Sequence, residues 1–392
     1  MYCPLYMLLW IVFPLVVSLC SAQVTAIDSS ACGCFLTNGS TPTYYSDHIF
    51  FDFRQLSQFA GVPGLIKETS ETTKAVASSD YFSSTDWTDV WSLQQWTNKI
   101  GKGNELRGGA SYLMLNTLNN VYIELNDGGD TSSDTFLTMR TSRQKTFQSV
   151  AEFQSVEANY KYLSIRMLSR TFGSPGACTA MFTYRDAGDG SQVQEADIEM
   201  LTGGPKNRIQ YTNQPSYDEN ETFPEATRNG TMPNGSLFSD WVVHRLDWTP
   251  NRSIWYVDGQ ETANIEFQTP RDASRVHFNT WSNGGSWTGE MPVGGEAFMQ
   301  IQWIEMVYNT TTENIVKDKE RRWAPGGVLS ERATTADHCQ VVCSIGEGDT
   351  AGEIALLWDN AAACMFPHCK DLWWWSTLTL PIWSVVITSL FI

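Results

Sequence analysis

The segment 195–200, EADIEM, places a carboxylate at every second residue: Glu195, Asp197 and Glu199. Successive side chains of a β-strand point to opposite faces, so these three acids share one face and the intervening apolar residues share the other. Like charges this close repel, and an ordinary strand seldom tolerates three of them unless a site uses them. A solvated acidic strand face is the plain structural alternative. If the three acids instead form a site, carboxyl groups of this kind suit general acid–base and nucleophilic catalysis.

Hydrolysis of a glycosidic bond needs two carboxyl groups across the bond, about 5–5.5 Å apart in retaining enzymes and about 6.5–9.5 Å apart in inverting ones. In an extended strand Glu195 and Glu199 have Cα atoms roughly 13 Å apart, at about 3.3 Å per residue. Side chains that lean inward on a concave strand would approach the shorter distance, which favours double displacement. One Glu would attack the anomeric carbon while the other protonates the leaving oxygen. Asp197 between them would push one pKa upward.

Short alternating apolar runs, separated by Gly, Asn, Asp and Pro, dominate residues 44–310 and must position this strand. Turn chemistry of this kind with few helical repeats predicts an all-β sandwich or barrel. Residues 61–85 lack a clear pattern and are interpreted as a surface loop. The runs expected to form strands are 49–53, 112–118, 121–125, 160–168, 178–184, 195–201, 242–248, 253–257 and 299–308.

The E-x-D-x-E pattern after an apolar strand resembles the signature of glycoside hydrolase family 16. Four further segments resemble blocks of that family in the same order: 175–184 (PGACTAMFTY), 244–250 (HRLDWTP), 255–259 (WYVDG) and 279–284 (NTWSNG). One residue between Asp197 and Glu199 is similar to the bulge-free branch, which includes lichenases and fungal cell-wall transglycosylases. Ala196 departs from the Ile, Leu or Val usual there.

This resemblance covers about residues 44–310. It implies a concanavalin A-like β-jelly roll with the substrate cleft on its concave sheet. Carried over to this chain, it implies Glu195 as the nucleophile, Glu199 as the general acid/base and Asp197 as the assisting carboxylate. A structural calcium ion would fit the family, although the sequence shows no dedicated metal loop, and no other cofactor is expected.

Aromatic side chains are expected beside the acids, because sugar rings stack on them. Trp281 and Trp287 flank a Gly-rich turn, and Asn279 shares strand parity with Trp281 and could hydrogen-bond a sugar hydroxyl. The predicted substrate contacts are Trp281, Asn279, Trp287 and, more weakly, Tyr184. Trp in a β-sandwich usually lies in the core. That interpretation is applied to Trp248 and Trp255, and His244 is interpreted as structural.

The charge balance is acidic, with 43 Asp and Glu against 26 Lys and Arg, a net charge of −17 and 5 His. Because no basic block offsets this excess, nucleic-acid binding is not expected. The motifs of serine hydrolases, P-loop nucleotide enzymes, zinc proteases and dinucleotide-binding folds are absent from the sequence.

Both ends of the chain resemble targeting segments. The apolar run 5–20 followed by Ser21 and Ala22 predicts a secretory signal peptide over residues 1–22, with a signal-anchor helix as the alternative. Asn360-Ala361-Ala362, a spacer and an uncharged tail predict a GPI-attachment signal with Asn360 as the lipidated residue and 361–392 as the propeptide. A plain C-terminal transmembrane tail is the alternative.

Of 9 Cys, five would remain between the two targeting segments: Cys32, Cys34, Cys178, Cys339 and Cys343. In an oxidising compartment the C-x-C of segment 23–43 could pair with the C-x₃-C of segment 311–360, leaving one free thiol. The spacing leaves the pairing open. Secretion also agrees with N-x-S/T glycosylation triplets, which begin at Asn38, Asn220, Asn229, Asn234, Asn251 and Asn309.

These features together predict a secreted, surface-anchored, retaining hydrolase or transglycosylase of β-glucans, monomeric, at the cell surface or in the cell wall. The rival is a glycan-binding lectin on the same sandwich. A purely structural surface glycoprotein is the third interpretation. The sequence leaves the glycan, and the choice between hydrolysis and transfer, open.

Overall fold

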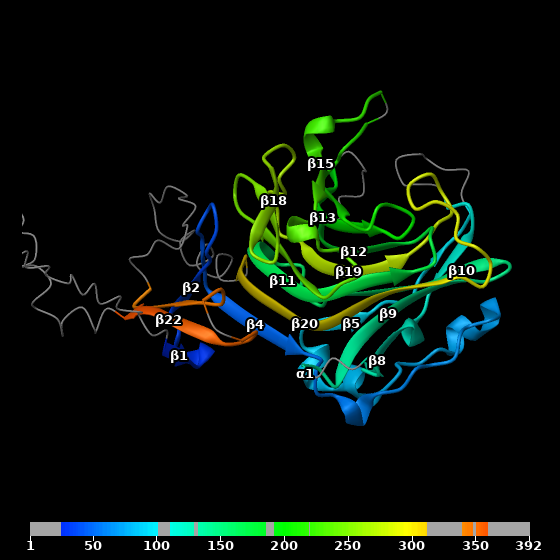
Figure 1. The fold of residues 1–392 in the computed structure, drawn as a ribbon, viewed down its shortest axis with the longest axis horizontal. Helices are drawn as coiled ribbons and strands as arrows, with labels where there is room; N and C mark the ends of the chain where they lie inside the picture. The colour runs from blue at the N-terminus through cyan, green and yellow to red at the C-terminus, as the bar shows by residue number, and fades with distance from the viewer. Residues whose placement is uncertain are drawn as a thin grey trace, which may run out of the picture.

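Two large β-sheets packed face to face form most of the molecule (Figure 1). The computed structural model describes residues 25–100, 110–128, 132–185, 192–218, 220–311, 339–347 and 350–359. The fold is mostly β, an antiparallel jelly-roll sandwich with strongly curved sheets, as predicted. Described strands alternate core-facing and outward-facing residues, which is why the apolar residues of most of them recur at every second position.

One sheet, here the site sheet, carries the three acids and is antiparallel throughout. In order across the sheet its strands are β5 (Trp91–Leu93), β10 (Phe147–Ser155), β19 (Arg275–Trp281), β12 (Cys178–Arg185), β13 (Gln194–Leu201), β14 (Arg208–Gln214) and β15 (Thr227–Thr231).

The opposing sheet, here the back sheet, runs in the order β8-β9-β20-β11-β16-β17-β18. Its strands are β8 (Val121–Leu125), β9 (Thr135–Arg143), β20 (Glu296–Thr310), β11 (Tyr160–Gly173), β16 (Val242–Trp248), β17 (Ser253–Val257) and β18 (Gln260–Ile265). Beyond β9, β20 also pairs with β4 (Asp47–Asp52).

Strand β10 joins the two sheets at one edge. Its first half, 147–150, pairs with β9 and with β7 (Leu113–Asn116), which in turn pairs with β6 (Thr97–Asn98). Its second half, 151–155, pairs with β19 and β5 in the site sheet. One strand thus changes sheets along its length.

The core between the sheets contains the apolar face of β13, since Ala196, Ile198 and Met200 are all fully buried. Trp248 and Trp255 are also fully buried, which confirms their assignment to the core. His244 lies there too, and burial lowers its pKa to about 4, so it is a neutral structural side chain at physiological pH.

The prediction of a plain surface loop over residues 61–85 is wrong in part. Tyr81 and Phe82 are buried and both pack against the fully buried Trp87, Phe82 edge-on and Tyr81 tilted, so this stretch contributes to the core. The described helical elements are short: α1 (Thr85–Thr88) and the 3₁₀ turns η1 (Ser29–Ala31), η2 (Ser57–Phe59), η3 (Thr69–Lys74), η4 (Asp80–Ser83), η6 (Leu118–Asn120), η8 (Pro224–Ala226) and η9 (Pro233–Gly235). None of the described helices is long and apolar enough to cross a membrane.

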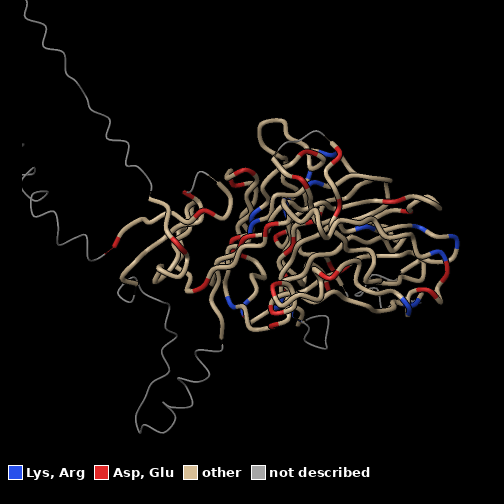
Figure 2. Tube along the Cα trace, turned by 90° about the horizontal axis from the view of Figure 1, so that it is seen from below, with Lys and Arg blue, Asp and Glu red and all other residues tan. Residues whose placement is uncertain are grey.

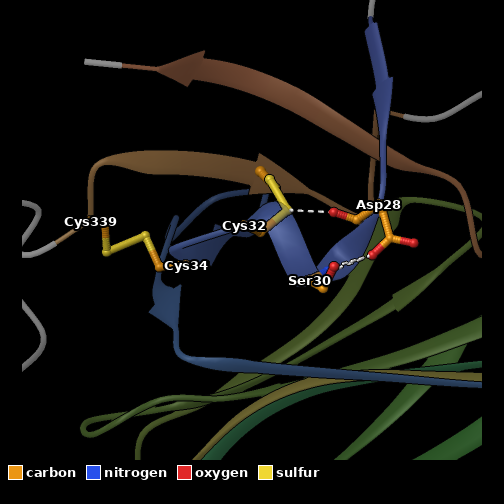
Figure 3. Close-up of a disulfide and its surroundings, with 6 residues drawn as sticks. Asp28, Ser30, Cys32, Cys34 and Cys339 are labelled. Carbon is orange, nitrogen blue, oxygen red and sulfur yellow. Dashed lines mark hydrogen bonds between the residues drawn. A yellow bond between two sulfur atoms is a disulfide. The ribbon is translucent and has the colours of Figure 1, made fainter. Parts of the chain in front are cut away.

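A separate small sheet joins the two ends of the described chain, at the left of Figure 1. Disulfides Cys32–Cys343 and Cys34–Cys339 tie it together across 311 and 305 residues, and Figure 3 shows the second of these beside Cys32. Cys178 is the remaining free thiol among the described cysteines. In order across the small sheet its strands are β1 (Thr25–Ile27), β22 (Ile354–Asp359), β21 (Val341–Ser344), β2 (Cys34–Leu36) and β3 (Tyr44–Tyr45).

The small sheet packs on the outer face of the back sheet, the face turned away from the site sheet. Its described residues include Asp and Glu but no Lys or Arg, as Figure 2 shows. Two arginines of the back sheet meet it: Arg245 donates to the backbone and side-chain oxygens of Asn38, at 2.6 and 2.7 Å, and Arg166 donates to the carbonyl of Ile345. Asp247 pairs with Arg245 and Glu305 pairs with Arg166, so each of these two buried carboxylates has a compensating positive charge.

Candidate active site

The register of β12 against β13 sets the positions of the acids. Glu195 lies opposite Tyr184, Asp197 opposite Phe182 and Glu199 opposite Ala180. Since the alternate residues of β13 face the core, all three carboxylates lie on the outer face of the site sheet. Asp197 is only 3% exposed, whereas Glu195 and Glu199 are half-buried. The shared face inferred from the sequence is therefore present.

Glu195 and Asp197 form a hydrogen-bonded pair. Burial raises the pKa of Asp197 well above its usual range, and the charges of Glu195 and Glu199 raise it further. The hydrogen bond between them raises the pKa of Asp197 and lowers that of Glu195, so Asp197 is the donor and the Glu195 carboxylate the acceptor. Burial raises the pKa of Glu195 to about 7, against the lowering effect of this hydrogen bond. Glu195 thus ionises with Asp197 still protonated.

Glu199 has different partners. Oε1 of Glu199 accepts from Sγ of Cys178 at 3.4 Å and from Nε1 of Trp287 at 3.3 Å. Burial raises the pKa of Glu199, while these two donors lower it. Two Glu on one strand are therefore set in distinct environments, one bonded to a carboxylic acid and the other to a thiol and an indole. Burial raises the pKa of both carboxyls, so the assignment of Glu195 as nucleophile and Glu199 as acid/base follows the family resemblance and not these pKa shifts.

The predicted substrate contacts all come from the outer face of the site sheet or from the loop after β19. Asn279 and Trp281 lie on β19, opposite Ala180 and Cys178 of β12. Oδ1 of Asn279 is buried and has no hydrogen-bond partner among the described residues, so it is a free acceptor on this face. Tyr184 packs edge-on against His277, with ring centroids 5.7 Å apart.

Trp287 has a second role that its position in the sequence does not indicate. Its indole is 37% exposed, as a sugar platform would be, but its N–H bonds Glu199. Trp281 is half-buried and packs on a small apolar cluster.

Two further residues on the outer face of the site sheet, Glu152 and His277, were not predicted from the sequence. On β10, Glu152 bonds Nδ1 of His277 at 3.1 Å and accepts from Nε1 of Trp96 at 2.9 Å. His277 stacks on Phe182, which lies opposite Asp197. Strand parity could have found His277, because it is two residues before Asn279. Glu152 gave no usable signal, since β10 leaves one sheet for the other.

Most predicted glycosylation sites are exposed: Asn38, Asn220, Asn229, Asn234 and Asn251. The side chain of Asn38 is nevertheless engaged, since it accepts from Arg245 and donates to Glu347. Asn309 is half-buried and accepts from the backbone of Ser46 at 2.9 Å. Asn360 and both targeting segments lie outside the described residues. No group of three or more His, Cys, Asp or Glu in the described part of the chain is arranged to hold a metal ion.

Two glutamates in unlike environments on the outer face of one sheet provide the pair of carboxyl groups that glycoside hydrolysis needs. Residues 116–305 match the family model described as glycosyl hydrolases family 16, and this region runs from β8 into β20 and includes the three acids. Over this region the chain is similar to glycoside hydrolase family 16, as the resemblance of its sequence motifs implied.

The curated relatives include bacterial enzymes named β-glucanase. The chain is 31% identical over 137 residues to that of Bacillus licheniformis, covering 33% of this chain and 51% of the relative. It is 26% identical over 159 residues to that of Bacillus amyloliquefaciens, covering 39% and 62%. The matches thus span between half and two thirds of these relatives. A solved Bacillus licheniformis β-glucanase structure covers 57% of this chain and 94% of its own, at 21% identity and a TM-score of 0.44.

Proposed function

We propose that this protein is a retaining glycoside hydrolase or transglycosylase that acts on β-glucans by double displacement. The observation that carries the proposal is the unequal environment of Glu195 and Glu199 on one outward face of β13. The names of the curated relatives support β-glucan as the substrate class.

In the first step Glu195, ionised and held by the hydrogen bond from Asp197, attacks the anomeric carbon. The glycosidic C–O bond breaks, and Glu199 gives its proton to the leaving oxygen, which departs as an alcohol. The product is a glycosyl ester on Glu195, and Glu199 is then ionised. The raised pKa of Glu199 keeps it protonated for this step over a wider pH range than an exposed Glu.

In the second step ionised Glu199 removes a proton from the incoming hydroxyl, whose oxygen attacks the anomeric carbon and displaces Glu195. Water as the acceptor gives hydrolysis, and a sugar hydroxyl gives transfer. Both outcomes use the same residues. Two inversions at the anomeric carbon leave a β-configured product.

The protein is proposed to be secreted and held at the cell surface or in the cell wall. Support comes from the apolar N-terminal run, the small-residue triplet with its apolar tail, the glycosylation triplets and two disulfides, which favour an oxidising compartment. Treatment of intact cells with a phosphatidylinositol-specific phospholipase should release the protein. Retention after treatment would favour a transmembrane tail.

A panel of β-1,3-, mixed-linkage and chitin–glucan substrates, with product analysis, tests the proposal. Reducing ends or labelled transfer products are expected from wild type, and neither from Glu195→Gln or Glu199→Gln. Binding without turnover on the whole panel would instead indicate the lectin. Since all three acids are retained, a catalytic protein is the better-supported interpretation.

A further inference from the structure

The acid/base Glu199 has two oxygens, but the reaction transfers a proton at one of them. Both neighbouring donors, the thiol of Cys178 and the indole N–H of Trp287, converge on the same oxygen, Oε1, at 3.4 and 3.3 Å. A proton on Oε1 would meet two donors head-on, so the transferable proton belongs on Oε2.

The strand register brings the thiol to this oxygen. Cys178 lies opposite Leu201, two register pairs beyond Ala180–Glu199 and therefore on the same face of the sheet. The small side chain of Ala180 leaves room for Glu199 to lean diagonally toward Cys178. The thiol is fully buried, and its other described acceptor, the carbonyl of Thr179, is farther away at 3.7 Å. Cys178 therefore directs its hydrogen mainly to Glu199.

We propose that Cys178 and Trp287 are positioning residues that hold Oε1 of Glu199 and thereby reserve Oε2 for the proton exchanged with the sugar oxygens. This inference rests on the proposed function, because it assigns roles around the same acid/base. Cys178 is not a nucleophile and never touches the substrate in this arrangement. Trp287 contributes both a hydrogen bond and an exposed ring.

The electrostatics agree with a donor role. Burial, together with the charge of Glu199, raises the pKa of Cys178 well above its usual range, so the thiol keeps its hydrogen. The titratable groups that face Glu199 are Glu195 and Asp197 on its own strand and Cys178 on β12. Its partner across β14 is the neutral Gln210. Loss of either donor should therefore raise the pKa of Glu199, because the donors favour its ionised form.

The test compares pH profiles of Cys178→Val and Cys178→Ser on a β-glucan that wild type cleaves. Val keeps roughly the volume of the thiol and removes the donor, so the alkaline limb of kcat/KM should move up by about half a pH unit or more. Ser keeps a donor and should leave that limb at or below its wild-type position. KM should be unchanged in both. Trp287→Phe should move the limb in the same direction as Val and also raise KM.

The matched control is Thr183→Val, on the same strand but facing the core. The Thr183 hydroxyl is buried and has no hydrogen-bond partner within the described residues, so its profile should equal that of wild type. An independent readout is the infrared titration of the Glu199 carboxyl, identified by its loss in Glu199→Gln. Coincident profiles and titrations for wild type, Cys178→Val and Cys178→Ser would overturn the inference, while an inactive wild type would overturn the proposed function.

Discussion

Asp197 donates a hydrogen bond to Glu195, two residues earlier on the same strand. The bond exists because burial keeps Asp197 protonated when Glu195 ionises. Through this hydrogen bond Asp197 lowers the pKa of Glu195, the proposed nucleophile. The opposing strand places Phe182 across from Asp197, which helps to keep water away from it.

Replacement of Asp197 should shift the acidic limb of the activity profile in a direction set by the hydrogen bond. Asp197→Ala removes the donor, so the pKa of Glu195 rises above its value of about 7 and the acidic limb moves to higher pH. Asp197→Asn keeps an N–H donor and should stay nearer wild type. The kcat/KM of all three proteins between pH 4 and 9 provides the measurement. A lower acidic limb in Asp197→Ala would contradict the assigned role.

The raised pKa values also predict how stability depends on pH. A carboxyl whose folded pKa lies above its unfolded value stabilises the fold below the unfolded pKa, and this contribution is lost as the pH rises through the folded pKa. For Glu195 the window runs from about 4.5 to about 7. Glu195→Gln should therefore lose less stability than wild type between pH 5 and 8, by about 1–2 kcal/mol. Urea unfolding at both pH values measures this difference, and parallel losses would contradict the prediction.

Substitution of Glu199 should slow the two steps unequally. Glu199→Ala should reduce kcat/KM for polysaccharide by about 10²–10⁴-fold, because the leaving oxygen is no longer protonated. A substrate with a good leaving group needs no such proton and should still form the ester on Glu195. Added azide should then accelerate turnover and give a β-glycosyl azide. An α-configured azide would mean that the two Glu roles are exchanged.

Asn279 should affect binding more than chemistry. Its buried Oδ1 has no described partner and awaits a donor, which a sugar hydroxyl can supply. Asn279→Ala should raise KM about tenfold with a smaller change in kcat, a loss of about 1.4 kcal/mol. Thr280→Val, the next residue on the opposite face, is the control. An unchanged KM in Asn279→Ala would remove Asn279 from the substrate site.

The disulfides should stabilise the fold without affecting turnover. Loss of both bridges, through Cys32→Ser and Cys34→Ser, should cost roughly 5 kcal/mol, because each closes a loop of about 300 residues. Loss of Cys34–Cys339 alone should cost less, since the other bridge still closes nearly the same loop. At 25 °C kcat/KM should remain unchanged, because the small sheet packs on the back sheet. Thermal unfolding and initial rates of the variants check both statements.

Local alternation predicted more of this molecule than contacts between distant segments. The shared face of Glu195, Asp197 and Glu199 follows from period-two geometry alone, and so does the parity of Asn279 and Trp281. Strand β9 was not predicted from the sequence, because the polar residues on its outward face are covered. Arg140 donates to the carbonyl of Pro63, and all nine strand residues are buried. Where polar residues are buried in this way, the alternation of exposed polar and buried apolar residues no longer identifies a strand.

The position of Cys178 beside Glu199 was beyond sequence reasoning for a different reason. It depends on the register between β12 and β13, which pairs residues 178 and 201, and on the small size of Ala180. The same limit applied to the disulfides, whose spacing allowed more than one pairing. Register and pairing are set by the packing of the whole sandwich and not by local pattern.

Covalent trapping tests the central claim most directly. Wild type is incubated with an activated 2-deoxy-2-fluoro-β-glucan oligosaccharide, which slows hydrolysis of the intermediate, and is then digested and sequenced by mass spectrometry. One added glycosyl mass is expected, located on Glu195. A label on Glu199, or inversion of the anomeric centre with no trapped ester in an active preparation, would contradict it.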